Sequence, residues 1–325
     1  MGGNRVLETT SKIIENPKYV FIDQATIDNV GEKIAGEDLE IPSWDAPVFL
    51  DGDDQATIDF FLLGNSINFA YTDFDSGVKY STGFMDTEWK GAFGMWAALK
   101  KAVQQGLPIL EGEYLSRVSA EDLKTIFHGN IEIPLFDERL EIFRQVGEVL
   151  AVNYSGHFYN LVEASNGRLF NQGTGLVERL TKDFPSFDDS VVYNGEVVRF
   201  DKRAQLGPAM LYGRFGNQGQ FQMGDVDELT VFADYVLPKS LRDMGILIYE
   251  ESLANRIDNH QLINAGSQEE LEIRASTIHA SKMLQDRINQ YRTDNPVNAL
   301  HIDYRLWAES RNKPGPHHLT KTTAY

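Results

Sequence analysis

The residues best suited to chemistry in this chain lie in segment 224–245, where acidic side chains interrupt an apolar run. Its apolar positions cover too much of a helix surface for an exposed helix, which predicts one largely buried helix. Asp234 lies inside the run, and Lys239 is the nearest cation in sequence. A buried carboxylate needs a distant partner or carries a raised pKa. Asp234 is therefore a candidate catalytic residue, although a carboxylate that caps a helix or pairs with a distant Arg would show the same pattern.

Two adjacent cations, Lys202 and Arg203, start another predicted helix, over residues 202–215. Positive charge at a helix N-terminus opposes the helix dipole and costs stability unless an anion lies nearby. Lys202 could pair with Asp234, hold a bound phosphate, or be ordinary surface charge.

The composition is that of a globular chain with a strong negative charge. The 325 residues are 42% hydrophobic, and 30 Lys and Arg against 48 Asp and Glu give a formal net charge of −18. This charge repels a nucleic acid unless a basic stripe exists, and the sequence shows none. The absence of cysteine excludes disulfides, thiolate nucleophiles and zinc–thiolate sites.

The sequence also lacks the usual signatures of a cofactor, a metal or a membrane. It contains no HExxH pattern, no glycine-rich phosphate loop and no apolar run of membrane-spanning length. We therefore expect no cofactor, no protein-bound metal and no membrane partner. The N-terminus has no apolar leader, so a cytoplasmic location is expected.

The hydrophobic periodicity predicts a mainly α-helical fold with one small β element. Asn194-Gly195 between alternating apolar residues predicts a hairpin of the type I′ kind, which delivers Phe200 and Lys202 to a helix start. We expect one domain over residues 1–312, as one unit or as two helical lobes about a cleft, and a flexible tail over 313–325. Further helices are predicted over residues 4–16, 23–34, 55–71, 91–106, 134–154, 267–292 and 299–310, and another starts at Ser119, with Asp122 in a near capping box.

Several short motifs occur in a characteristic order. They are SINFAY (Ser66–Tyr71), IPLFDERLEIFRQVG (Ile133–Gly147), FDKRAQ (Phe200–Gln205), LTVFADY followed by Pro238, EIRASTI (Glu272–Ile278) and IDYRLW (Ile302–Trp307). Together they resemble the queuosine salvage family of nucleotide N-glycosylases. The resemblance runs from about the sixties to Trp307. It departs from the family pattern at Ala70-Tyr71-Thr72, where an aromatic pair ending in Trp is usual, and in GAFGMWAAL, which lacks a Cys.

The resemblance implies hydrolysis of queuosine 5′-monophosphate to queuine and ribose 5-phosphate, for queuine salvage into tRNA. It also implies an architecture related to the helix-hairpin-helix DNA glycosylases. A 7-deazapurine lacks the basic N7 that would be protonated as a purine leaves, so catalysis must stabilise positive charge on the ribosyl carbon. A buried carboxylate does this electrostatically or by direct attack. Asp234 is the expected carboxylate, with Lys202 as its partner.

The same resemblance implies the residues that bind substrate. A flat base calls for aromatic rings, its side-chain ammonium and diol call for acids and amides, and a phosphate calls for Lys or Arg. With Lys202, Arg203 and Arg274 on the phosphate, we expect the 5′-monophosphate to be cleaved at least about a hundredfold better than the nucleoside. The candidate substrate-binding residues are Asn68, Phe69, Phe200, Arg203, Asp225, Glu228, Tyr235, Glu272, Arg274 and Asp303.

Two other functions fit parts of the sequence. A non-catalytic helical protein could bind a partner through its acidic surface, with the polar motif residues as buried networks. A glycosylase acting on other nucleotides or on damaged nucleic acid would need a basic channel and intercalating residues, which the sequence does not show.

Overall fold

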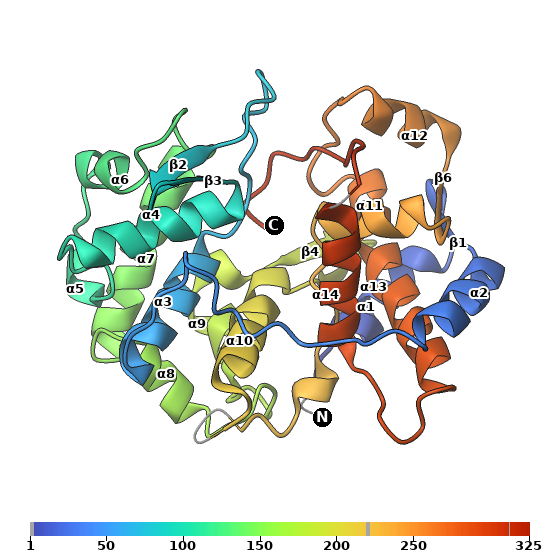
Figure 1. Ribbon diagram of the computed structural model, residues 1–325, viewed down its shortest axis with the longest axis horizontal. Helices are drawn as coiled ribbons and strands as arrows, with labels where there is room; N and C mark the ends of the chain where they lie inside the picture. Colours follow the sequence, from blue (N-terminus) through green and yellow to red (C-terminus); the bar gives the residue numbers. More distant parts are fainter. Residues whose placement is uncertain (1–2, 219–221, 312) are drawn as a thin grey trace.

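The computed structural model describes residues 3–218, 222–311 and 313–325, and it is mainly helical (Figure 1). The described helices are α1 (Val6–Ile14), α2 (Gln24–Ile34), α3 (Asp54–Ser66), α4 (Ala92–Gln104), α5 (Gly112–Leu115), α6 (Ala120–Ile126), α7 (Phe136–Asn153), α8 (Phe158–Ala164), α9 (Leu176–Asp183), α10 (Lys202–Phe215), α11 (Val236–Asp243), α12 (Glu251–Asp258), α13 (Gln268–Asn289) and α14 (Ala299–Arg311). The described strands are β1 (Val20–Ile22), β2 (Ser81–Phe84), β3 (Thr87–Lys90), β4 (Ser190–Tyr193), β5 (Glu196–Arg199) and β6 (Leu247–Tyr249). In this part of the chain, no helix is long and apolar enough to cross a membrane.

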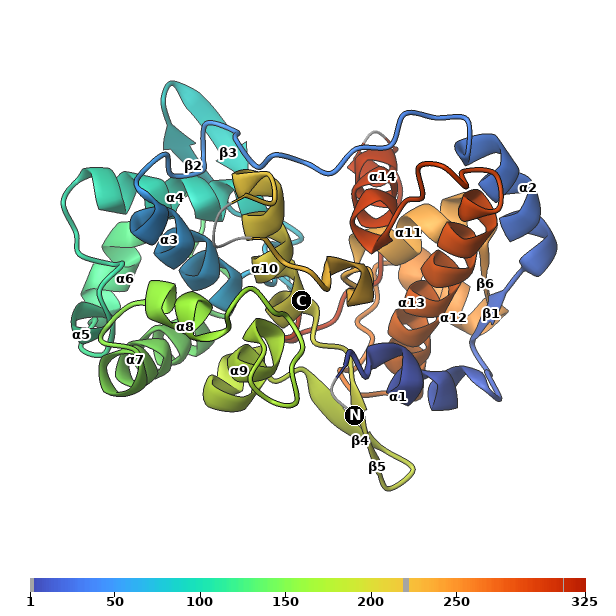
Figure 2. The ribbon, with the colours of Figure 1, turned by 90° about the horizontal axis from the view of Figure 1, so that it is seen from below.

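Buried apolar side chains of the described residues gather in two clusters. One cluster is built mainly from α3, α4 and α6 to α10, and the other mainly from α1, α2 and α11 to α14. The two groups of helices lie on opposite sides of the molecule, with α10 between them (Figures 1 and 2). The second cluster therefore combines helices from the two ends of the sequence, which are distant along the chain but pack together.

Several local predictions are confirmed. The helix predicted to start at Ser119 is α6, where Ser119 and Asp122 form a reciprocal capping box. Asn194 and Gly195 both have positive φ, 50° and 83°, as a type I′ turn requires, and they join β4 to β5. The mainly helical fold with small antiparallel strand pairs follows the sequence prediction.

Two further strand pairs were not predicted. Strands β2 and β3 are joined through Met85 and Asp86, which have positive φ although neither is glycine or asparagine, so no turn signal marks this hairpin. Strand β1 pairs with β6 across more than half of the chain, a contact that local periodicity cannot reveal.

The prediction of one helix over residues 224–245 is wrong. Val226–Glu228 form one 3-10 turn, residues 229–233 have no regular secondary structure, and the α-helix starts only at Val236. Side chains take the backbone donors that a helix would use: the N–H of Thr230 binds Gln205 at 3.0 Å, and that of Phe232 binds Asp303 at 2.8 Å. These polar partners come from α10 and α14, far away in sequence.

Residues 313–325 do not form a flexible tail, and residue 312 lies outside the described part of the chain. The carbonyl of Leu319 accepts the N–H of Ile263 at 2.8 Å, and His318 and Tyr325 are buried. Figure 1 shows this segment, in dark red, returning to the middle of the molecule. Polar and Pro-rich composition suggested a tail, but the aromatic side chains dock it on the helices.

A buried cation holds the loop after α3. Arg139 of α7 is fully buried and donates hydrogen bonds to the carbonyls of Ile67, Phe69 and Ala70 at 2.5 to 2.7 Å, and to that of Pro134 at 2.9 Å. Its guanidinium also lies 4.3 Å from the centre of the Phe69 ring. The loop's backbone conformation therefore depends on one side chain.

Replacing that side chain tests this dependence. Arg139→Met removes the donor of the Phe69, Ala70 and Pro134 carbonyls, whereas the Ile67 carbonyl keeps the N–H of Phe69. Each unsatisfied group costs about 1 to 3 kcal/mol, so we expect the free energy of unfolding to fall by at least about 3 kcal/mol. Urea denaturation measures it. The control is Arg117→Met, at an exposed ion pair, where we expect a change below about 1 kcal/mol. Equal stability of the two variants would contradict the assignment.

Candidate active site

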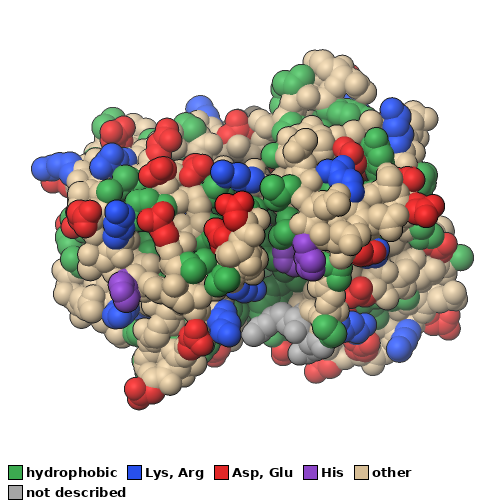
Figure 3. All heavy atoms as spheres, turned by 90° about the horizontal axis from the view of Figure 1, so that it is seen from above, with side chains coloured by type: hydrophobic (Ala, Val, Ile, Leu, Met, Phe, Trp, Pro, Cys, Tyr) green, Lys and Arg blue, Asp and Glu red, His purple; other side chains and the backbone are tan. Residues whose placement is uncertain are grey.

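A pocket of about 950 Å³, including its open mouth, lies between the two hydrophobic clusters. Its walls come from the loop before α3, from α4 and α10 on one side, and from α11 and α14 on the other. On the face drawn in Figure 3, hydrophobic side chains reach the notch between the lobes, while Lys and Arg side chains are interspersed with acids. The described polar and charged side chains in the lining are Asn68, Tyr71, Lys202, Asp234, Tyr235, Asp303, Tyr304 and Tyr325.

Asp234 lies two residues before the start of α11. Its Oδ1 accepts the N–H groups of Val236 at 2.7 Å and Leu237 at 3.1 Å, which leaves Oδ2 unused in holding the helix. A helix N-terminus stabilises negative charge, so the carboxylate is supported in an otherwise apolar wall. Asp234 therefore both holds the start of α11 and lines the pocket, so the two interpretations made from the sequence do not exclude each other.

Lys202 is buried at the first position of α10. Burial lowers the pKa of its ammonium to about 8, while the negative charges of Asp234 and Asp303 act in the opposite direction. Its Nζ lies 3.5 Å from the Asn68 carbonyl oxygen, and its backbone N–H donates to Asp189 at 3.2 Å. Lys202 is the one Lys or Arg among the described lining residues.

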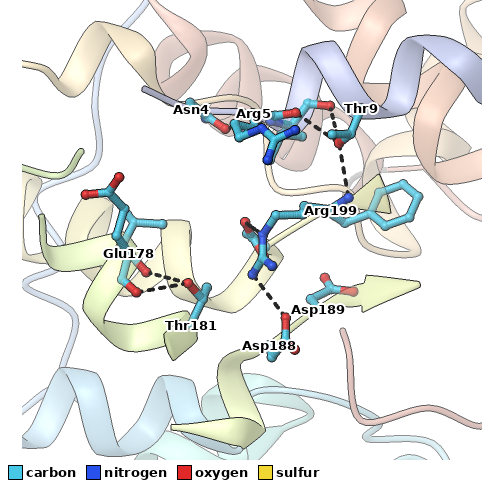
Figure 4. Close-up of polar contacts among 12 residues, drawn as sticks. Asn4, Arg5, Thr9, Glu178, Thr181, Asp188, Asp189 and Arg199 are labelled. Atoms are coloured by element: carbon cyan, nitrogen blue, oxygen red, sulfur yellow. Dashed lines mark hydrogen bonds and ion pairs between the residues drawn. The ribbon is translucent and has the colours of Figure 1, made fainter. Parts of the chain in front are cut away.

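The hairpin before α10 is anchored on both sides of the helix start. The N–H of Arg199 donates to the Thr9 hydroxyl at 3.1 Å, and its guanidinium reaches Asp188 at 3.0 Å and Asp201 at 2.9 Å (Figure 4). Asp188 and Asp189 come directly before β4, whose first residue pairs with Arg199 at the end of β5. These contacts fix the backbone that leads into Lys202.

Asp303 faces the pocket from α14. Its Oδ2 accepts the N–H of Phe232 at 2.8 Å. Burial raises the pKa of Asp303 to about 8 and the charge of Asp234 adds to this, whereas the Phe232 N–H and Lys202 lower it. A largely protonated carboxyl group near neutral pH could donate a hydrogen bond to a ligand.

Two more predicted residues, Asn68 and Tyr235, also line the pocket. The Asn68 Oδ1 accepts the Tyr71 hydroxyl at 2.7 Å, so the amide is oriented by a second lining residue. Tyr235 follows Asp234, and its ring lies 4.4 Å from the ring of His317.

The structure places the other predicted cations outside the described lining. Arg203 donates to the backbone carbonyls of Ser66 and Ser186, and burial lowers its pKa to about 10. Arg274 forms two bonds to Asp189, at 2.9 and 2.5 Å, and this carboxylate keeps its pKa raised although burial opposes it. Two of the three cations expected to bind phosphate therefore lie outside the described lining. The predicted hundredfold preference for the monophosphate loses the support of these two.

Most of the remaining predicted residues hold the backbone. Asp225 accepts the N–H groups of Leu169 and Phe170 at 2.9 to 3.0 Å, and Glu272 accepts those of residues 18–20 at 2.7 to 3.0 Å. Glu228 is exposed on another part of the surface. The rings of Phe69 and Phe200 are buried against the guanidinium groups of Arg139 and Arg274. These residues lie outside the pocket lining as described.

The sequence prediction missed the aromatic walls. Phe93 of α4 stacks on Trp307 of α14 with ring centres 6.2 Å apart, and Trp307 stacks on Tyr304 at 6.0 Å. The motifs GAFGMWAAL and IDYRLW contain these rings, but only the fold brings them together. The described aromatic lining consists of Trp44, Phe49, Tyr71, Phe93, Trp96, Phe232, Tyr235, Tyr304, Trp307 and Tyr325. Among the described residues, no cluster of three His, Asp or Glu side chains could hold a metal ion.

Comparison with known proteins identifies the family. The family described as queuosine salvage protein matches residues 49–325. A protein of Sphaerobacter thermophilus named queuosine 5′-phosphate N-glycosylase/hydrolase is 35% identical over 98% of this chain and 97% of its own. The chain belongs to the queuosine salvage protein family.

Other similar proteins carry the same name. One from Bos taurus is 27% identical over 98% of each chain, and one from Schizosaccharomyces pombe is 32% identical over 78% of this chain and 75% of its own. The resemblance noted in the sequence is thereby confirmed. Tyr71 and Trp96, which lie in the two segments where a departure from the family pattern is expected, both line the pocket.

The raised pKa of Asp303 predicts a pH-dependent stability difference. Between about pH 4 and 8 the folded protein keeps a proton on Asp303 that the unfolded chain has lost, so this group destabilises the fold increasingly as pH rises through that window. We expect Asp303→Asn to gain stability relative to wild type from pH 4 to pH 8, measured by denaturant unfolding. Asp294→Asn, at an exposed acid, should run parallel to wild type. Parallel curves for Asp303→Asn would contradict the raised pKa.

Proposed function

We propose that this protein hydrolyses the N-glycosidic bond of queuosine 5′-monophosphate and releases queuine and ribose 5-phosphate. The proposal is supported by the names of its relatives and by one observation in particular. A helix start presents the carboxylate of Asp234 to an aromatic-walled pocket, with the ammonium of Lys202 among the same lining residues. Flat rings bind a base, and a fixed carboxylate stabilises a cationic ribosyl carbon.

The chemistry assigned to Asp234 follows from its two oxygens. Oδ1 is held by α11, so the carboxylate plane is fixed before substrate binds. Oδ2 can then face C1′ as the bond to the deazapurine lengthens and positive charge develops on the sugar. Stabilisation of that charge followed by water attack, and direct attack by the carboxylate, both start from this arrangement.

Lys202 and Asp303 complete the proposed catalytic group. Lys202 is proposed to orient Asp234, because both line the pocket and the charge of that carboxylate raises the pKa of the buried ammonium against the effect of burial. Asp303, with Asn68 and Tyr235, is proposed to bind the substrate. The relation to helix-hairpin-helix DNA glycosylases and the cytoplasmic location belong to this proposal as predictions from the sequence.

The proposed reaction is tested by presenting purified protein with queuosine 5′-monophosphate, guanosine 5′-monophosphate and an oligonucleotide that contains queuosine. We expect base release, followed by chromatography, from the first substrate alone. Release from the oligonucleotide or from guanosine monophosphate at a similar rate would favour a broader glycosylase, and release from none would overturn the proposal.

Asp234→Asn tests the carboxylate. The amide oxygen can still accept the N–H groups of α11, so the fold is kept, but it carries no charge to stabilise the sugar cation. We expect kcat/KM to fall at least about a hundredfold with an unchanged melting temperature. Asp227→Asn, at an exposed acid of the same segment, serves as the control. Turnover near the wild-type rate would remove Asp234 from the mechanism.

Lys202→Met tests the role of the buried ammonium. If Lys202 orients Asp234, kcat falls by at least about tenfold, which corresponds to about 1.4 kcal/mol, and falls equally for queuosine 5′-monophosphate and for queuosine. Lys182→Met, at an exposed position, is the control. A loss confined to the phosphorylated substrate would instead make Lys202 a phosphate ligand.

A further inference from the structure

The C-terminal segment, residues 313–325, reaches the pocket that both proposed catalytic side chains line. Tyr325 belongs to the pocket lining, and the ring of His317 packs on Tyr235, the residue next to Asp234. The segment is docked at several points: the Leu319 carbonyl binds the N–H of Ile263, and the buried His318 lies 3.1 Å from the Tyr325 hydroxyl.

One route leads from this segment to Lys202. The guanidinium of Arg274 lies between two rings, 4.0 Å from the centre of Phe200 and 4.7 Å from that of Tyr325. Arg274 forms its two bonds to Asp189, and Oδ2 of Asp189, which accepts one of them, also accepts the backbone N–H of Lys202. Because a buried ion pair stabilises only when its geometry is held, the contact of Tyr325 with Arg274 bears on the ion pair that holds the start of α10.

A second route leads to Asp234. Its carboxylate holds the N–H groups at the start of α11, and Tyr235 is the residue between the carboxylate and those groups. The His317 ring packs against the Tyr235 ring, with ring centres 4.4 Å apart and planes tilted by 31°. The carbonyl of Ala233, just before Asp234, lies 3.4 Å from Nε of Arg274, so the two routes meet at this point.

We propose that His317 and Tyr325 are positioning residues, which hold Asp234 and Lys202 in their reactive arrangement. This inference rests on the proposed function for its kinetic test. The two residues act on the geometry of the reacting groups, and a displacement of about 1 Å in such groups can cost a hundredfold in rate.

The kinetic test uses the full chain with queuosine 5′-monophosphate. We expect His317→Ala and Tyr325→Ala to lower kcat at least about tenfold, with KM for His317→Ala within about threefold of wild type. Tyr325→Phe keeps the ring on Arg274 and should retain most of the activity. Lys321→Ala, at an exposed position in the same segment, is the control. Wild-type kcat in both alanine variants, or a Tyr325→Phe variant as slow as Tyr325→Ala, would overturn the proposal.

A second measurement does not depend on activity. Residue-resolved amide hydrogen exchange should show faster exchange at Val236 and Leu237 in His317→Ala, and at Lys202 in Tyr325→Ala, with both unchanged in Lys321→Ala. If wild-type protein released no base while these amides lost protection as expected, the proposed function would fail and the positioning network would stand. Unchanged exchange in both alanine variants would overturn the network, and His317→Ala alone decides the matter if Tyr325→Ala does not fold.

Discussion

The arrangement of this pocket depends on keeping charged side chains in a mainly apolar space between the two groups of helices. Lys202 is buried in the lining of a pocket that Asp234 and Asp303 also face, and the charges of these two acids oppose the burial that lowers the pKa of Lys202. Removing such a group leaves a buried charge uncompensated, which is far more costly than losing a surface pair. Backbone N–H groups hold the two carboxyl groups in place: those at the start of α11 bind Asp234, and that of Phe232 binds Asp303.

Buried charged side chains hold the backbone around this group of residues in place. Arg139 binds the loop that carries Asn68, Arg203 binds the carbonyls at the end of α3, and Arg274 binds Asp189 beneath Lys202. Glu272 and Asp225 do the same for backbone N–H groups elsewhere. Planar guanidinium groups and carboxylates hold several backbone atoms at once, which suits a site assembled from distant segments. The motif residues therefore divide into those that face the pocket and those that hold its frame.

Local signals in the sequence predicted much of the fold. Capping residues such as Ser119, the Asn194-Gly195 turn and the helical periodicities act over a few residues, and the structure contains them. The segment around Asp234 was predicted as one helix because its partners, Gln205 and Asp303, are distant in sequence. For the same reason the docked segment 313–325 was expected to be a flexible tail.

The candidate site could be predicted only in part. Five predicted residues come together in the pocket lining: Asp234, Lys202, Asn68, Tyr235 and Asp303. Arg203 and Arg274 carry the positive charge expected for a phosphate site, but they bind buried groups of the protein instead. Residue type does not distinguish a cation that binds a ligand from one that binds the backbone. The aromatic walls were hidden for a related reason, since Phe93 and Trp307 meet only through the packing of α4 and α14.

The most direct measurement is a crystal structure of the Asp234→Asn variant with queuosine 5′-monophosphate bound. The account predicts the ribosyl C1′ within about 3.5 Å of the substituted amide side chain at position 234, the distance of a group poised for reaction, and the base against the aromatic walls of the pocket. Well-ordered substrate with C1′ far from that side chain, or bound outside this pocket, would contradict the account.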